Sequence, residues 1–585
     1  MFLSSNKKAD SVEEVYQIDS QSTMGKITPV YPRSLSSSPS STKKIVSAQM
    51  AGSECGDDPD AIDHLKMTRA RYFQDTSLHG LKYIEEPNRH WTERIFWFIA
   101  VLAAVAIAIY FISGVFIKWH KSPVLVSFDS EQKWINEIPF PAVTICNMNM
   151  ILKSHYENAA SKVAADPNDE EHKLELIFAE EVCGNHLEEE DQIEEHGDLS
   201  LTGDQFNFFM KDLTPSCENL LKRCTFQGHE VNCTDIFIPI ITDEGQCCSF
   251  NIMPESIMLK NSEADPVEEK RWAGWSLQDG YVEAVANSFE EEHKLPYKDR
   301  SMPMRALGPG QQMGLSVLLD VEEDEYFCSS AESFGFKILP YMPISMPMMK
   351  GFGLALHPGT ETFLGVRPTI IHTEDDLATI AVDKRQCFFD HEKDLRFFNQ
   401  HSFLTCYIEC MTNQTISMGG CVSFYFPRPS DDPNSPDYVP VCSPDKLECI
   451  TEAAHRVQEE AMRKTSNCDC LPSCTSIGYP HEATTSSLKK ASLLKLSKEL
   501  LDAKPQYADD EYVKNNLAIV HIFFAEGHLM LHERSRLFTT LDLIAQIGGL
   551  LGLCMGLSMI SVVELAYFFT MRLYINTKLD RCEEK

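Results

Sequence analysis

A long run of uncharged residues limits what this chain can fold into. Arg94 and Lys118 bracket 23 residues, Ile95–Ile117, and none of them is charged. A helix that crosses the core of a bilayer needs about 20 apolar residues, at roughly 1.5 Å each. The run lies too deep in the chain to be a cleaved signal peptide. We therefore predict a transmembrane helix over residues 95–117.

A second apolar stretch, near the other end of the chain, carries polar residues of its own. It runs from Leu537 to Met571 and contains Asp542, Gln546 and Glu564. Polar side chains are costly in lipid, so they are expected to face water or protein and to have a function. We predict a second transmembrane helix over residues 537–571.

Two spans place both ends of the chain on the same side of the membrane. Lysines and arginines before the first span and after the second favour cytosolic termini. Residues 118–536 are then extracellular, where disulfides persist. Three of the twenty cysteines lie elsewhere: Cys55, Cys554 and Cys582. The sequons at Asn232 and Asn413 fall in the same extracellular part, so we predict that both are glycosylated.

Composition limits the partners and the chemistry. A net charge of -34 argues against nucleic acid, because phosphate binding needs clustered lysine and arginine. Catalytic and metal-site motifs are incomplete, so we predict no enzyme, cofactor or metal site. Residues 1–60, polar and Ser-Pro-rich, are predicted to be a disordered cytosolic tail. Residues 61–94 form a cytosolic pre-membrane segment and residues 572–585 a cytosolic tail. The acidic stretches Glu188–Asp191 and Glu322–Glu325 are interpreted as solvated surface.

Two pairs of cysteines have matching spacings. A helix through Cys406 and Cys410 puts both thiols on one face, about 6 Å apart. An extended segment through Cys468 and Cys470 does the same, with a rise of roughly 6.6 Å. Each of the first pair can bond to one of the second pair without strain. Another disulfide is possible outside them, between Cys387 and Cys474. We predict a stapled, structural region rather than a redox or zinc site.

Small residues recur on one helix face of the second apolar stretch. The small residues follow i, i+4, i+7, i+11 spacing and are Ala545, Gly549, Gly552 and Gly556. Ile560 and Glu564 are expected to continue the same face. Small residues alone indicate tight helix packing as readily as a pore. The polar Ser558 and Glu564 favour a pore, which several subunits must enclose together. Carbonyl and hydroxyl oxygens in a narrow ring suit a small hard cation. We therefore predict a cation channel.

Four motifs carry a family resemblance over roughly residues 70–575. In chain order they are Ser77-Leu-His79-Gly80, Phe140-Pro-Ala-Val-Thr-Ile-Cys146-Asn147, the cysteines from Cys387 to Cys474, and Gly549 to Ser558 followed by Val563-Glu564-Leu565. Together they resemble the epithelial sodium channel/degenerin/acid-sensing channel superfamily, most closely its insect pickpocket branch. The resemblance implies an α+β membrane protein with two transmembrane helices per subunit. It also implies a disulfide-rich extracellular domain of finger, thumb, palm, knuckle and β-ball, a homo- or heterotrimer, sodium selectivity and amiloride sensitivity.

The resemblance also implies roles for single residues. Gly556-Leu557-Ser558 resembles the selectivity filter, and His79-Gly80 resembles the gating motif. Ala545 resembles the degenerin site at the outer mouth, where it is implied to act in gating. The implied pore-lining residues are Ala545, Gly549, Gly552 and Glu564. The implied disulfides are Cys146 with Cys247, Cys224 with Cys233, Cys387 with Cys474, Cys406 with Cys470, Cys410 with Cys468, and Cys421 with Cys442.

The chain departs from the family pattern at two places. Gly419-Gly420-Cys421 stands where the family has Cys-x-Cys, so Cys449 loses its expected partner. Gln546 stands where acid-sensing members carry an aspartate at the outer mouth. Five cysteines of the extracellular part remain outside the implied pairs: Cys183, Cys217, Cys248, Cys328 and Cys449. Their odd number leaves at least one thiol free or intermolecular.

The prediction is a subunit of a sodium-permeable plasma-membrane channel, in contact with membrane lipid and with related subunits. An extracellular ligand or a mechanical signal would reach the second span through Leu517–Phe524, a predicted buried strand. An ATP-gated trimeric channel is an alternative, which would need a basic nucleotide pocket. A non-conducting receptor or auxiliary subunit is another. Recordings from cells that express this chain alone separate these hypotheses.

Overall fold

The computed structural model describes residues 71–575 of the chain. Gaps in this description fall at 87–88, 122, 184–200, 289–290, 292, 431, 433, 443–445, 464–467, 490–503 and 573. One compact unit spans Phe73–Glu564, and Tyr72 and the described residues from Leu565 onward belong to a second. The predicted tail over residues 1–60, the stretch Glu188–Asp191 and residues 576–585 lie outside the described residues.

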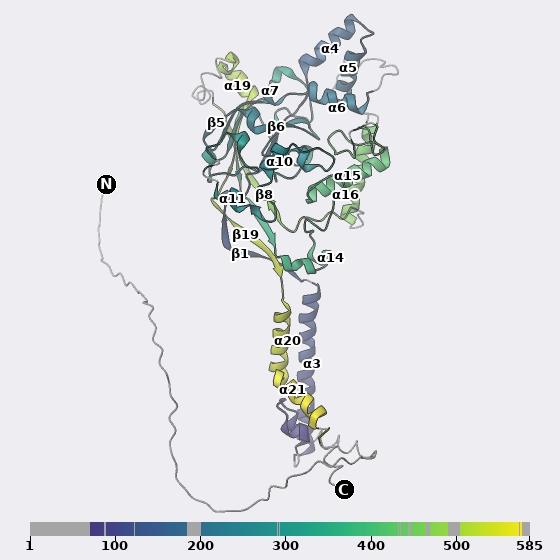
Figure 1. Cartoon of the computed structure of the whole chain (residues 1–585), viewed down its shortest axis with the longest axis vertical. Helices are drawn as coiled ribbons and strands as arrows, with labels where there is room; N and C mark the ends of the chain where they lie inside the picture. Colours follow the sequence, from purple (N-terminus) through teal and green to yellow (C-terminus); the bar gives the residue numbers. More distant parts are fainter. Residues whose placement is uncertain are drawn as a thin grey trace, which may run out of the picture. The chain divides into compact units, whose positions relative to one another are not determined.

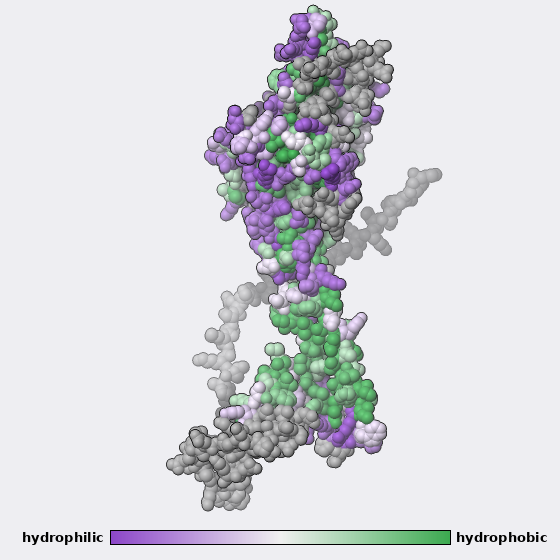
Figure 2. Space-filling view, turned by 90° about the vertical axis from the view of Figure 1, so that its right-hand side faces the viewer, coloured by the Kyte–Doolittle hydropathy of each residue, from purple (hydrophilic) through white to green (hydrophobic). Residues whose placement is uncertain are grey.

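The first predicted span lies within one long helix. Helix α3 (Trp91–Lys121) contains all of residues 95–117, and it is long and apolar enough to cross a membrane. It packs along α20 (Thr540–Met555), and the two helices run side by side in Figure 1. Figure 2 shows green, hydrophobic side chains gathered over these helices, whereas the surface of the sheets is mostly purple. Such an apolar exterior suits lipid better than water.

The second predicted span is not one continuous helix. It is divided into α20 and α21 (Met559–Ala566), and Thr540–Met555 and Met559–Arg572 meet at a bend of 73°. Among the described residues the chain therefore has one membrane-crossing helix, or two if the bent pair counts as one span. The expectation that Ile560 and Glu564 continue the small-residue face of α20 is wrong. Both residues lie on α21, and the helix axis changes direction between α20 and α21.

Asp542 has a local structural role at the start of α20. Its carboxylate accepts hydrogen bonds from the Thr539 backbone N–H and hydroxyl, at 3.0 and 2.8 Å. The Thr539 hydroxyl in turn accepts from the Asp542 N–H. This capping box satisfies backbone donors that the first helical turn leaves unpaired. This capping role accounts for Asp542 in the second apolar stretch, and it does not require that Asp542 line a pore.

Two antiparallel strands connect the helices to the rest of the fold. β1 (Val124–Trp134) follows α3 and pairs with β19 (His528–Arg536), which precedes α20. Figure 1 shows the pair directly at the ends of the two helices. β15 (Thr369–Thr373) and β16 (Ser476–Gly478) complete a four-stranded sheet in the order β1-β19-β15-β16. The path from the larger sheets to α20 therefore runs through β19.

The two larger sheets hold the main hydrophobic core. The six-stranded sheet has the order β17 (His481–Ser487), β14 (Thr360–Val366), β18 (Leu517–Phe524), β10 (Leu315–Asp320), β4 (Leu221–Phe226) and β5 (His229–Val231). The five-stranded sheet has the order β13 (Leu354–Leu356), β12 (Phe336–Tyr341), β2 (Ala142–Asn147), β7 (Gly245–Phe250) and β6 (Phe237–Thr242). β18 coincides with the predicted strand and is buried almost throughout. It does not lead straight into the second span, however, because β19 intervenes.

Short strands and helices surround these sheets. The strands are β3 (Asn149–Leu152), β8 (Trp275–Ser276), β9 (Gly280–Tyr281) and β11 (Tyr326–Ser329). The helices are α2 (Lys82–Glu85), α4 (Lys153–Ala165), α5 (Glu170–Cys183), α6 (Gly203–Asp212), α7 (Cys217–Leu220), α8 (Cys233–Ile236), α9 (Glu255–Met258), α10 (Pro266–Trp272), α11 (Glu283–Asn287), α13 (Met349–Phe352), α14 (Val382–Arg385), α15 (Phe403–Gly419), α16 (Leu447–Arg463) and α19 (Asp510–Asn516).

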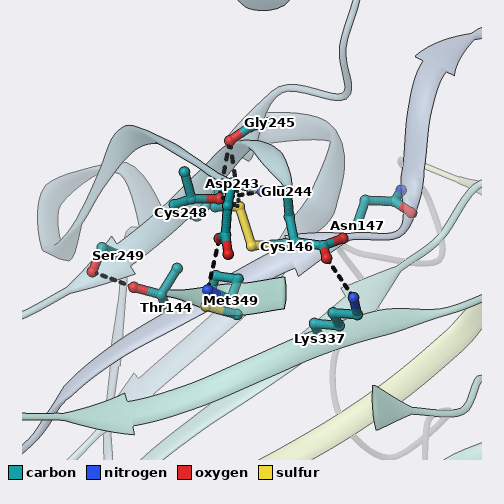
Figure 3. Close-up of a disulfide and its surroundings, with 12 residues drawn as sticks. Thr144, Cys146, Asn147, Asp243, Glu244, Gly245, Cys248, Ser249, Lys337 and Met349 are labelled. Carbon is teal, nitrogen blue, oxygen red and sulfur yellow. Dashed lines mark hydrogen bonds and ion pairs between the residues drawn. A yellow bond between two sulfur atoms is a disulfide. The ribbon is translucent and has the colours of Figure 1, made fainter. Parts of the chain in front are cut away.

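A disulfide fixes the centre of the five-stranded sheet. Cys146 on β2 bonds to Cys247 on β7, next to the turn that carries Asp243 and Glu244 (Figure 3). The Glu244 carboxylate is almost fully buried and accepts a hydrogen bond from Lys337 on β12. A buried carboxylate without a cationic partner would be strongly destabilising. The Phe140–Asn147 motif of the sequence is thus a core strand held by a disulfide to β7, and the ion pair links the β6–β7 turn to the neighbouring strand β12.

Burial also corrects the interpretation of Glu322 as solvated surface. Its carboxylate accepts from Lys504 at 2.5 Å and from Lys222 at 3.3 Å, and its side chain is mostly buried. Burial lowers the pKa of the Lys222 ammonium, an effect that the nearby Glu322 charge opposes. Glu322 is therefore a structural ion-pair residue.

The six disulfides that the resemblance implies are all present in the structure. α15 carries Cys406 and Cys410, as the spacing predicted. Their partners do not lie on an extended strand, because Asp469 between them has a φ of +42°. Two further disulfides use four of the five remaining cysteines: Cys183 with Cys328 and Cys217 with Cys248. The free thiols of the described residues belong to Cys449 and Cys554.

Gly419→Cys is expected to form a ninth disulfide in the described residues. A Cβ atom at Gly419 would lie 2.9 Å from Cys449 Sγ, close to the distance of about 3 Å between a Cβ atom and the distal sulfur of a disulfide. The new bond should raise the free energy of unfolding by about 2–4 kcal/mol. Peptide mapping without reduction and thermal unfolding check both effects.

Gly420→Cys is the control for alkylation alone, because its Cβ atom would meet nothing within 4 Å but its φ of +66° strains any residue other than glycine. This variant should leave Cys449 open to alkylation. If Cys449 in the Gly419→Cys protein is alkylated as fast as in the unmodified chain, the predicted bond does not form.

Candidate functional site

The break between α20 and α21 follows from one glycine. Gly556 has a φ of +68°, and its N–H donates to the Gly552 carbonyl at 2.8 Å. The Leu557 N–H reaches back to the Leu551 carbonyl at 3.4 Å. The Gly556 bond is the 5→1 bond of an αL C-cap, which ends a helix with a left-handed residue, usually glycine. The segment Gly556-Leu557-Ser558 therefore stops α20 and leaves helical carbonyls without intrahelical partners.

The segment before the first span lies against this break. The His79 N–H donates to the Met555 carbonyl at 3.0 Å, so it satisfies one of those carbonyls. A Cβ atom at Gly556 would lie 2.8 to 2.9 Å from three atoms of the His79 ring. Gly80, with a φ of +86°, approaches α3 so closely that a Cβ atom would lie 2.9 Å from Val101. The structure thus brings the predicted gating motif and the predicted filter into direct contact.

A cluster of hydroxyls and one carboxylate continues beyond the break. The Ser558 hydroxyl accepts from the Ser561 N–H at 3.2 Å, as an N-cap residue does at the start of a helix. The Ser77 hydroxyl donates to Glu564 Oε2 at 2.8 Å and lies 2.9 Å from the Ser561 hydroxyl. Glu564 is therefore bound to the segment before the first span. Ser561, which is only 2% exposed, is a further member of the cluster that the sequence motifs did not include. The Ser-x-x-Ser spacing of an N-cap and its N3 residue was the available signal.

The small residues of α20 face outward from the subunit. Ala545 and Gly549 are exposed, and a Cβ atom at Gly548 or Gly549 would meet nothing within 4 Å. A Cβ atom at Gly552 would approach only the Leu557 carbonyl, at 3.6 Å. The described residues of this chain thus leave the face unpacked. Small, unpacked residues on a membrane helix are typical of close contact with another helix.

One arginine connects the start of α20 to the disulfide-bonded region. Arg536, the last residue of β19, donates from Nη2 to the Asp376 carbonyl at 2.6 Å and to the Thr379 hydroxyl. Its Nε lies 2.8 Å from an Asp376 carboxylate oxygen. Both partners belong to the short helix Asp375–Thr379, which sequence analysis did not single out. Because Thr539 caps α20 only three residues later, this contact lies directly before the second span.

The helix Asp375–Thr379 is itself fixed to the Cys387–Cys474 disulfide. Leu377 packs against both cysteines in a small buried cluster. The buried Arg385 donates to the Cys387 and Ile380 carbonyls, each at 3.0 Å, and pairs with Glu392. Burial alone raises the pKa of the Glu392 carboxyl, but the bonds from Arg385 and from a backbone N–H outweigh it, so the pKa lies below its usual value. The helix Asp375–Thr379 and the Cys387–Cys474 disulfide can therefore move together with Arg536.

A membrane helix beside a glycine-broken second helix, joined to a disulfide-bonded domain, is the arrangement of an ion-channel subunit. Comparison with known proteins gives the same class. The chain belongs to the amiloride-sensitive sodium channel family, which matches residues 72–568. This membership confirms the resemblance seen in the motifs, and the family is one of ion channels rather than of enzymes.

Relatives in flies and fish are similar over most of their length. The chain is 28% identical to pickpocket protein 28 of Drosophila melanogaster, over 91% of this chain and 84% of that protein. It is 23% identical to the sodium channel protein Nach of the same species, over 90% of each. It is also 23% identical to acid-sensing ion channel 1B of Danio rerio, over 91% of this chain and 83% of that protein.

Proposed function

We propose that the chain is one subunit of a trimeric, amiloride-sensitive, sodium-permeable channel of the plasma membrane. Both termini are cytosolic and residues 118–536 are extracellular. The observation that carries the proposal is the unpacked small-residue face of α20, which ends at a glycine break. Three copies of this face around an axis enclose a narrow path, as cyclic assembly requires. The names of relatives such as the sodium channel protein Nach support sodium as the conducted ion.

The proposed selectivity filter is Gly556-Leu557-Ser558. At a helix break, backbone carbonyls and the Ser558 hydroxyl supply oxygen ligands to a partly dehydrated cation. Ala545, Gly549 and Gly552 line the path on one side of the filter. Glu564 lies on the other side, where its bond to Ser77 ties the pore-side helix to the gating segment. Opening the pore then requires His79 and Ser77 to shift relative to α20 and α21.

Gating signals pass from the extracellular domain through β19 and Arg536. The earlier hypothesis named β18 as the last strand, and the structure adds β19 between it and the span. The Cys387–Cys474 end of the stapled region moves Arg536, and Arg536 moves the cap of α20.

Cells that express the chain should carry an inward sodium current through the plasma membrane. Its reversal potential should follow the sodium gradient, and amiloride should block it. Whole-cell recording during sodium replacement, with surface protein quantified in the same cells, tests the proposal. The chain alone, or its Ala545 variant described below, could reach the surface and carry no current. If a current then appears only when a related subunit is co-expressed, this chain is an auxiliary subunit. Surface protein without current in every combination would refute the channel proposal.

Removing the Arg536 side-chain contact should change gating by about twofold to fivefold. The Arg536 and Asp376 side chains are 28% and 52% exposed, so their ion pair contributes only about 0.5–1 kcal/mol after solvent screening. Arg536→Gln and Asp376→Asn should each alter the current per surface channel, and the double variant should do no more than either one. Arg456→Gln, which breaks an exposed pair with Glu452 within α16, is the control. Fully additive effects of the two variants would contradict the coupling.

A further inference from the structure

A hollow of about 810 Å³ lies on the extracellular part of the chain, remote in sequence from both spans. Its walls come from six elements: α7, β4, β5, α8, β6 and β7 (Gly245–Phe250). Two disulfides hold these walls together, Cys217 with Cys248 and Cys224 with Cys233. The hollow is therefore a fixed feature of the fold, with a volume typical of ligand sites, about 300–1,000 Å³.

The sequon at Asn232 opens into this hollow. Asn232 and Thr234 both line it, and Cys233 between them bonds to Cys224 on β4, the strand that pairs with β5. Asn232 directly precedes α8 and is exposed, and its side chain makes no capping bond to that helix. Its amide nitrogen is thus available for an N-linked sugar. Because Asn232 forms part of the wall, the first sugar residues must start within the hollow.

The walls offer the mixture of surfaces that a sugar needs. Arg223 binds Glu230 through two parallel bonds of 2.7 and 3.0 Å, which presents an ordered pair of polar groups. Gln246 is half-buried, and its side-chain amide makes no hydrogen bond to any described residue. Its oxygen and nitrogen are an acceptor and a donor for hydroxyls. The exposed Pro239 adds apolar surface beside it, whereas Phe237 is buried in the core.

We propose that the hollow is occupied by the chain's own N-linked oligosaccharide, attached to Asn232. The core sugars pack on the apolar surface of β6 and hydrogen-bond to Gln246, so the hollow is closed to soluble ligands of the extracellular domain. The proposal rests on the extracellular placement of residues 118–536 but not on conduction. Asn413 provides a contrast, because it is exposed on α15 and lines no part of this hollow.

Native deglycosylation of the full-length protein tests the proposal. The chain is produced in animal cells, purified in detergent and treated with peptide N-glycosidase, which converts the sugar-bearing Asn to Asp. Mass spectrometry then gives the rate at each site. Release at Asn232 should be at least about tenfold slower in the folded protein than after reduction and denaturation. Release at Asn413 should change much less.

Gln246→Ala separates occupation of the hollow from cover by a neighbouring subunit. Ala in place of the half-buried Gln246 removes the amide that hydrogen-bonds to the sugar, so native release at Asn232 should speed up while Asn413 stays unchanged. No acceleration would point to a neighbouring subunit and overturn the proposal, as would equal rates in the folded and denatured protein. Sugar at Asn413 but not at Asn232 would also overturn it, whereas sugar at neither site would count against the extracellular placement as well.

Discussion

Replacing Ala545 with valine or a larger residue is expected to produce a standing sodium current without any stimulus. Ala545 is exposed on the outer face of α20, where three copies meet in the proposed trimer. Three large side chains must overlap in a closed pore or force the helices apart. Overpacking costs about 1–3 kcal/mol, and about 1.4 kcal/mol shifts an equilibrium tenfold. One substitution can thus move a mostly closed channel to a mostly open one.

Whole-cell current at rest, divided by surface protein, measures this effect. Ala545→Gly should stay silent, because it adds no volume. Ala106→Val is a matched control on α3, where the side chain is exposed away from α20 and bulk should be tolerated. If the larger residues leave the resting current unchanged in a channel that conducts when stimulated, Ala545 faces lipid and has no gating role.

Gly556→Ala is expected to abolish or broaden cation selectivity while the protein still reaches the surface. The left-handed backbone costs a non-glycine residue roughly 1–2 kcal/mol. The added Cβ atom also meets the His79 ring at 2.8 Å, so the ring or the filter has to move. A displaced filter no longer fixes oxygen atoms around the ion. Reversal potentials in sodium and in potassium report the change, and a bulkier residue at Ser558 should act in the same direction.

Combining His79→Ala with Gly556→Ala gives a double variant that tests the contact between these two residues. Removing the ring should restore part of the selectivity of Gly556→Ala, since only the backbone strain remains. Gly548→Ala is the control within α20, because its Cβ atom meets nothing within 4 Å. Unchanged reversal potentials in Gly556→Ala would place the filter elsewhere in the chain.

Features that depend on local sequence were predictable. A long uncharged run predicts α3, and a short apolar run with isoleucine, valine and phenylalanine predicts β18. The spacing of Cys406 and Cys410 predicts that both lie on one face of α15. In each case the signal is a periodicity or a composition within one element. The pairing of those cysteines needed the family resemblance, because spacing alone left two arrangements open.

Features that depend on backbone geometry or distant contacts were not predictable. The sequence allowed a break at Gly556, but the spacing that aligns Gly549 with Gly556 also fits an unbroken helix, so it did not predict the bend of 73°. Asp469 disrupts the expected extended segment through its positive φ. The contacts of His79 with Gly556 and of Arg536 with Asp376 join residues far apart in the sequence, and nothing local to either partner marks them.

The joint between β19 and α20 contains almost no slack. Only Leu537 and Phe538 separate Arg536 from the helix-capping Thr539, a reach of at most roughly 3.5 Å per residue. The Leu537 N–H also donates to the Pro123 carbonyl at 2.8 Å, which ties this joint to the strand that leaves α3. A stiff joint of this kind does not damp a displacement. Tension or torsion applied to the outer domain would therefore reach both membrane helices together, as rapidly as the domain itself can move.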